Sequence, residues 1–281
     1  MESIRFVFKN SLRKLVLALS KKNVIAGAML GSIIILKQSV GYLRYSGSHT
    51  VNILEPYILS YSGIGTALSI LIGAIIVCAD APFIDDSSFM QIHRTGRGTW
   101  YKSCWVYIIL ILFFYYLLLA GISIFPILKN GYTQNEWSQT ILNIMGEGND
   151  RSSKYGLFSP SKTISPLSPL FAFIFTFFDS YLYSVFLISI LFVFNMLNTN
   201  RAVGTALIVC IHLFAYFLTF TDSIFPLIVK KLSLIRNAYF PIEYNAYVSS
   251  PIFSVIFFIL LIYLVYLTGE KFLPMVDYYV K

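Results

Sequence analysis

The sequence predicts an all-α, polytopic membrane protein with six transmembrane helices, an amphipathic helix at the N-terminus and a short cytoplasmic helix between spans two and three. First, 57% of the residues are hydrophobic and only 12% are charged, against about 25% charged in soluble domains, so lipid must face most of the surface. Second, several apolar runs reach the roughly 20 residues that a spanning helix needs. Third, these runs lack the alternation of β-barrel strands. We expect one transmembrane domain over residues 1–281.

Residues 1–23 have the pattern of an interfacial helix. Arg5, Lys9 and Arg13 recur at intervals of four on one face. The other face is apolar and carries Ile4, Val7, Phe8, Leu12, Leu15, Val16 and Leu19. This pattern predicts a helix lying in the membrane interface with its basic face toward the headgroups. The alternative is an N-terminal flank that only fixes the topology.

Six apolar segments are candidate spans: residues 24–43, about 57–79, 104–128, within 170–197, 202–229 and 251–267. The fourth and fifth exceed the minimum length, which favours a tilted or broken helix in each. Lys37 of the first segment is expected to extend toward the far interface.

The orientation follows from the distribution of basic residues. Six precede the first span: Arg5, Lys9, Arg13, Lys14, Lys21 and Lys22. This excess predicts a cytoplasmic N-terminus, and six spans return the C-terminus to the cytoplasm. Lys230, Lys231 and Arg236 run against the rule, because they would be extracellular. Abundant Ile, Lys, Tyr and Phe are typical of a low-GC bacterium, so we expect a bacterial plasma membrane.

Two long loops are expected outside the cell, at residues 129–169 and 230–250. Loops of this length usually have a function or are disordered. Within the first, Trp137, Ile141, Leu142 and Met145 predict a short amphipathic helix before Gly146.

The polar loop at residues 80–103 begins "DAPFIDDSSFMQIHRTGRGTW". Ser88 and Gln91 have capping-box spacing, and Asp85 and Asp86 precede them, where negative charge suits a helix N-terminus. Phe89, Ile92 and His93 then share a face, and we expect Gly96 and Gly98 to end the helix. A simple connection needs only about 2–8 residues. The loop therefore predicts a cytoplasmic helix that packs against a partner.

The segment "QIHRTGRGTWYKS" resembles the Arg-x-x-Arg-x-x-Trp turn that precedes the third span in permease subunits of type-2 ATP-binding cassette exporters, here at Arg94, Arg97 and Trp100. The six spans and the N-terminal helix are also similar to that family. The resemblance implies that the loop is a coupling helix docking on a separate ATPase, through Asp85, Asp86, Phe89, Ile92, Arg94 and Arg97. The long loop 129–169 departs from better-known members and leaves the substrate open. Alternatively, Arg94, Arg97 and Lys102 only fix the topology or meet lipid phosphates.

Motifs for chemistry of its own are absent from the sequence. "GIGTALS" and "RTGRGTW" lack the lysine of a phosphate-binding loop, so no cofactor is expected in this chain. If ATP drives the protein, ATP and Mg²⁺ bind the separate ATPase that the resemblance implies. The zinc-protease pattern H-E-x-x-H is missing, so no metal site is expected. Cys78, Cys104 and Cys210 lie in or beside apolar segments, which argues against a disulfide framework. We expect a protein that is not an enzyme.

Polar residues within the apolar segments are the remaining candidates for a substrate path, namely Asp179, His212 and Asp222, with Asn195 beside them. Charges at membrane depth are costly and favour a cavity or pathway. Asp179 and Asp222 fall in the outer halves of their segments. They could instead mark helix ends or make interhelical hydrogen bonds. For His212, a packed neutral histidine is favoured over a proton relay.

With this resemblance, the chain is expected to be a permease subunit that pairs with an identical or related permease and moves an amphipathic cargo outward, such as a peptide, antimicrobial or lipid-like molecule. The expected partners are a P-loop ATPase, the second permease and membrane lipids, with no nucleic acid. The alternative is a stand-alone secondary transporter or scaffold, for which a discontinuous helix or a deep carboxylate would be the sign.

Overall fold

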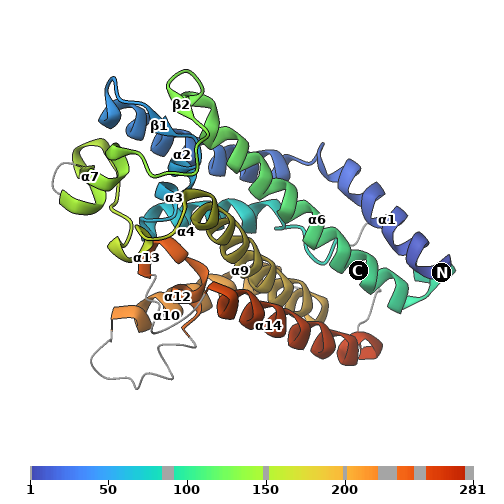
Figure 1. Ribbon diagram of the computed structural model, residues 1–281. Helices are drawn as coiled ribbons and strands as arrows, with labels where there is room; N and C mark the ends of the chain where they lie inside the picture. Colours follow the sequence, from blue (N-terminus) through green and yellow to red (C-terminus); the bar gives the residue numbers. More distant parts are fainter. Residues whose placement is uncertain are drawn as a thin grey trace.

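The computed structural model describes residues 2–83, 92–147, 152–198, 201–220, 233–243 and 251–275. These residues form a bundle of helices, as the sequence predicted, together with one pair of two-residue strands that it did not predict (Figure 1). Four helices are long and apolar enough to cross a membrane: α2 (Lys22–Ser46), α6 (Arg97–Ile124, continued by the 3₁₀ turn η1, Phe125–Ile127), α9 (Pro169–Leu197) and α14 (Pro251–Phe272). α9 is unbroken despite its length.

The second predicted span is not one continuous helix, so that expectation is wrong. It is divided into α3 (Glu55–Ser60) and α4 (Ile64–Val77). Gly63 between them has an extended backbone. A Cβ atom on Gly63 would collide with the ring of Phe158, so the loop before α9 packs directly into the break. The break leaves α4 with 14 residues, fewer than the roughly 17 that a spanning helix needs.

The fifth predicted segment forms α10 (Arg201–Phe220). Its described apolar part, Ala202–Tyr216, is also shorter than the four long helices. The rest of the predicted segment, with Asp222, lies outside the described residues.

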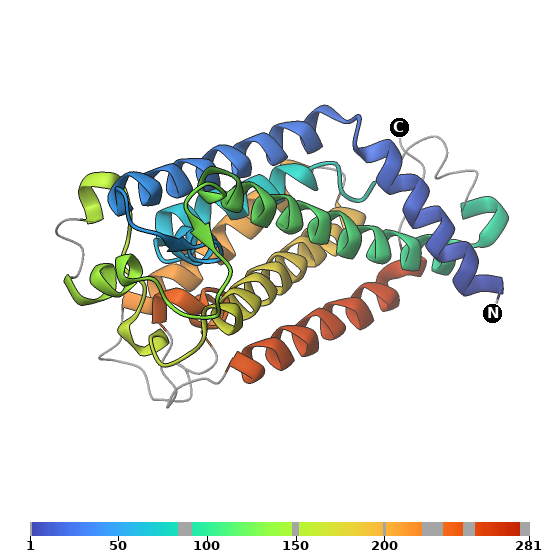
Figure 2. The ribbon, with the colours of Figure 1, turned by 45° about the horizontal axis from the view of Figure 1, so that its top comes forward.

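The N-terminal helix predicted from its apolar and basic faces is present as α1 (Glu2–Ala18). Ser11, Leu15 and Ala18 are buried, while Arg5 and Lys9 are exposed. α1 packs beside the first turns of α6 (Figure 2). The Ser11 hydroxyl donates a hydrogen bond of 2.9 Å to the carbonyl of Ser103 in α6. We call the end of the bundle where α1 lies the α1 end.

Helices α2 and α4 approach each other through glycines. A Cβ atom on Gly27 would lie 2.5 Å from the carbonyl oxygen of Gly73, and a Cβ on Gly31 or Gly73 would collide with the hydroxyl of Tyr115. That hydroxyl donates 2.8 Å to the carbonyl of Ile70. Small residues permit such close backbone packing between helices in membranes, so the Gly27-x-x-x-Gly31 spacing holds α2, α4 and α6 together.

The opposite end of the bundle carries what we call the loop cap: β1 (Val51–Asn52), α3, β2 (Gly131–Tyr132), α7 (Gln139–Glu147), η2 (Ser153–Tyr155) and η3 (Lys162–Ile164). Figures 1 and 2 both show α7 and α1 at opposite ends. Strands β1 and β2 pair in parallel. α7 is the predicted amphipathic helix, although it continues past Gly146. Its buried Ile141, Ile144 and Met145 share a small apolar core with Tyr42 and Leu157.

Two short helices, α12 (Leu234–Ala238) and α13 (Phe240–Glu243), pack on α9. The 3₁₀ turn η4 (Leu273–Met275) follows α14. Residues 129–169 and 233–243 therefore contain regular elements where the sequence predicted loops.

Candidate functional site

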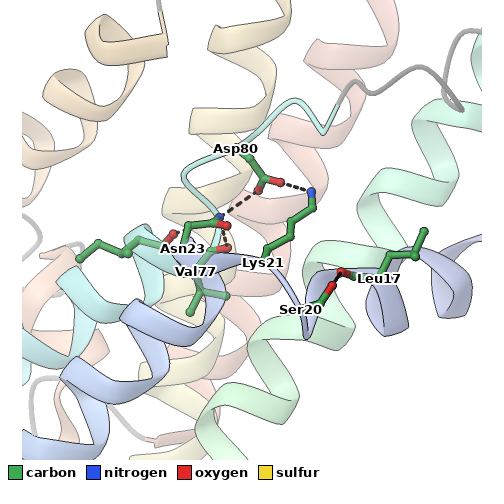
Figure 3. Close-up of polar contacts among 7 residues, drawn as sticks. Leu17, Ser20, Lys21, Asn23, Val77 and Asp80 are labelled. Carbon is green, nitrogen blue, oxygen red and sulfur yellow. Dashed lines mark hydrogen bonds and ion pairs between the residues drawn. The ribbon is translucent and has the colours of Figure 1, made fainter.

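The start of the polar loop at residues 80–103 is anchored to the linker between α1 and α2 (Figure 3). The ammonium of Lys21 forms an ion pair with the Asp80 carboxylate. The amide of Asn23 donates to Asp80 Oδ1 at 3.4 Å and to the carbonyl of Val77 at 3.3 Å. Because the Lys21 side chain is 41% exposed, such a pair contributes only about 0–1 kcal/mol to stability. Together with the two Asn23 hydrogen bonds, it connects the residues after α4 with the start of α2.

The described end of this loop is helical over residues 92–95. The N–H of Gly96 donates 2.9 Å to the carbonyl of Ile92, and Gly96 has φ +83°. This left-handed conformation, which glycine adopts without a Cβ clash, ends the turn. α6 then begins at Arg97. Gly96 therefore ends the helix as predicted. The expectation that Gly98 ends it is wrong, because Gly98 lies in the first turn of α6.

The three residues of the Arg-x-x-Arg-x-x-Trp resemblance have different environments. Arg94 is exposed. Arg97 belongs to α6, and its Nη1 donates 3.2 Å to the carbonyl of Pro274 in η4. Trp100 is fully buried, and the ammonium of Lys14 lies 5.7 Å from its ring centroid, within range of a cation–π interaction. The loop end is thus fixed to α1 and to the turn after α14.

The remaining residues expected to dock on an ATPase are only partly described. Asp85, Asp86 and Phe89 lie outside the described residues. Ile92 is half-buried and packs against the main core of the bundle, so only part of its side chain is exposed for contact with a partner. Arg94 is exposed and best available to a partner.

Asp179 and His212, the described candidates for a substrate path, are both buried in the bundle, with 1% and 2% exposure. Asp179 lies ten residues after the start of α9, or about 15 Å along the helix, so it does not mark a helix end. Its Oδ1 has no hydrogen-bond partner among the described residues. His212 Nδ1 lies 2.8 Å from the hydroxyl of Tyr183, and the Tyr239 ring packs nearby. These contacts favour the packed histidine.

An apolar groove of about 480 Å³ runs between α6, α9 and α14. Its walls include Trp105, Tyr181, Leu182 and Tyr263, and Lys102 lies at its α1 end. A pocket of this volume with mainly apolar walls has the dimensions of small-molecule sites. The groove is suited to the hydrocarbon part of an amphipathic molecule, and sequence reasoning did not find it.

Glu55 is a second feature that the sequence analysis missed. It begins α3 of the loop cap, and it is fully buried. The hydroxyl of Tyr42 donates to it at 2.5 Å, the N–H of Asn52 at 3.1 Å, and the N–H and hydroxyl of Ser138 at 2.7 Å each. Burial raises the pKa of the Glu55 carboxyl, although these hydrogen bonds act to lower it. The one sequence signal was a single acid before a proline in "NILEPY".

Comparison of the chain with protein-family models, curated proteins and solved structures finds no match. The fold therefore defines the protein only as a mostly helical chain with four helices able to cross a membrane. Within the described residues, no group of three or more His, Cys, Asp or Glu side chains could hold a metal ion.

Proposed function

We propose that this chain is the permease subunit of an ATP-driven exporter of the ATP-binding cassette type, working with a second permease and a separate ATPase that binds ATP and Mg²⁺. The observation that carries the proposal is the attachment of the loop at residues 80–103 to different helices at its two ends. Asp80 is tied to Lys21 before α2, and Arg97 to Pro274 after α14. A force applied to this loop would reach both helices directly.

Six crossings of a plasma membrane are part of the proposal. Four are the long helices, and the segments that contain α4 and α10 supply the other two. The ends of the chain support an even number, because α1 and η4 both lie beside the start of α6. With the N-terminus in the cytoplasm, the α1 end is the inner end and the loop cap is outside.

In this mechanism, closure of two ATPase subunits pulls the loops of two permeases together and changes the packing of their spans. Outward transport also requires that the cargo bind the two states with different affinity. The apolar groove between α6, α9 and α14 suits an amphipathic peptide, antimicrobial or lipid-like molecule better than a small ion. Two permeases facing each other would let both grooves border one path.

The test is the interaction of the full-length chain with its ATPase, co-expressed from the neighbouring gene if that gene encodes a P-loop ATPase without spans. Arg94→Glu should weaken co-purification and lower the cargo response of ATP hydrolysis, because it reverses the charge of an exposed docking residue. Lys162→Glu, an equal charge change in η3 of the loop cap, should have no effect. Equal ATPase recovery with both variants would refute the docking role.

A second candidate function, an ion-coupled secondary transporter, is favoured by two observations. The break between α3 and α4 and the buried Asp179 are the features expected of that class. In proteoliposomes containing this chain alone, it predicts cargo transport driven by an ion gradient and lost in Asp179→Asn. Transport that requires ATP and the ATPase, and that survives this substitution, would exclude it.

A further inference from the structure

A second groove lies on the outside of α2 near the loop cap, with a volume of about 580 Å³. Its floor is α2 and its wall is the η2 turn. The carbonyl of Gly156 accepts a hydrogen bond of 3.1 Å from Gln38, and a Cβ atom on Gly41 would lie 2.6 Å from the carbonyl of Tyr155. The ring of Tyr155 makes an edge contact with Tyr45 at 5.7 Å. The wall is therefore held firmly against the helix.

The residues of α2 that line the groove recur at intervals of three and four, so they form one stripe along the helix. Ile33 and Leu36, 63% and 41% exposed, make the end nearer the middle of α2 apolar. Arg44 lies at the cap end of the stripe, and Lys154 of η2 lines the same groove. Lys37 lies between, seven residues before Arg44, which is about 10.5 Å along the axis. The groove thus changes along its length from apolar to strongly cationic.

The charges in this groove are not compensated within the described part of the chain. Its lining includes three cationic side chains and no acid. The single ion pair found among the described residues is Lys21 with Asp80, at the other end of α2. Lys37, Arg44 and Lys154 are all exposed. A lysine within a span extends its ammonium toward the interface, so Lys37 would direct its charge toward Arg44.

We propose that this groove binds one anionic phospholipid from the leaflet at the loop-cap end, with its phosphate between Arg44 and Lys154 and an acyl chain along Ile33 and Leu36. Arginine forks match phosphate oxygens, and basic pockets beside spanning helices bind anionic headgroups. The arrangement of the groove residues fits a lipid, because the headgroup would lie at the cationic end and the acyl chain at the apolar end. This site does not depend on the ATP-driven role. A bound lipid would join α2 to the loop cap.

The test uses the full-length chain in detergent micelles, titrated with palmitoyl-oleoyl phosphatidylglycerol or phosphatidylcholine and followed by native mass spectrometry. Wild-type protein should prefer phosphatidylglycerol. Arg44→Gln with Lys154→Gln should weaken its binding about thirtyfold, since each basic residue near a membrane contributes on the order of a fivefold change. The charge-conserving pair Arg44→Lys with Lys154→Arg should retain the preference for phosphatidylglycerol. That result would show that the η2 turn tolerates substitution at these positions.

The matched control is Lys129→Gln with Lys162→Gln, which removes two exposed charges from the same end of the molecule but outside the groove. This pair should bind phosphatidylglycerol as the wild type does. An equal loss in both pairs would indicate a diffuse charge effect and overturn the proposal. It would also be overturned if phosphatidylcholine bound equally well, if water-soluble glycerophosphoglycerol competed as strongly as the lipid, or if a polypeptide occupied the groove instead.

Discussion

Replacing Glu55 by alanine should release the loop cap from the bundle while leaving the long apolar helices folded. The substitution removes the side chain that accepts hydrogen bonds from Tyr42, Asn52 and Ser138. Each buried donor left without an acceptor costs about 1–3 kcal/mol. The hydroxyls of Tyr42 and Ser138 can still bond to each other, since they lie 2.9 Å apart, but the two backbone N–H groups cannot. We therefore expect a loss of about 3 kcal/mol.

This loss should be local, so hydrogen exchange measures it better than global melting. A loss of about 3 kcal/mol corresponds to an increase of roughly a hundredfold in the exchange of amides that open with the cap. We expect this increase in peptides covering α7, and little change in peptides from α6. Glu136→Ala is the matched control, because Glu136 is an exposed carboxylate between β2 and α7. Exchange of α7 in Glu55→Ala that stays close to the control value would refute the reasoning.

The remaining predictions concern pH, helix packing and a buried hydrogen bond. Because burial raises the pKa of Glu55 in the folded state, the loop cap should be most stable below the ordinary carboxyl pKa of about 4.3 and lose stability as pH rises through the raised value. Hydrogen exchange of α7, corrected for intrinsic rates, should show this loss of stability. Glu55→Gln should abolish the pH dependence. Gly27→Ala should lower the melting temperature in detergent by roughly 5 °C, because the added Cβ would collide with the carbonyl of Gly73. Gly121→Ala, where the added Cβ would meet open space, should not lower it. Equal shifts in the two variants would contradict the close packing of α2 on α4. Tyr183→Phe should lower the free energy of unfolding by about 1 kcal/mol, because it removes the hydrogen bond to His212. The melting temperature should fall by the same amount at pH 6 and at pH 8. A fall that depends on pH would instead indicate that the histidine titrates.

Several elements could be predicted because their signals are local. The N-terminal helix, the four long apolar helices and α7 each carry an apolar pattern that repeats within one segment, and burial of that pattern favours the helix wherever it packs. Gly96 ended the turn before α6 because glycine readily adopts positive φ. Segment boundaries were less predictable. Nothing between residues 97 and 103 distinguishes a polar loop from the polar first turns of α6.

The sequence by itself determined that this chain is helical, rich in lipid-compatible segments and basic at its N-terminus, since composition and periodicity are properties of each segment alone. Only the tertiary structure decided which segments meet. Glu55 receives hydrogen bonds from Ser138, 83 positions away, and Phe158 fills the break beside Gly63. Lys154 of η2 and Arg44 of α2, 110 positions apart in the sequence, line one groove. Such contacts depend on how the chain returns on itself, because distant residues acquire a common environment only when the helices pack.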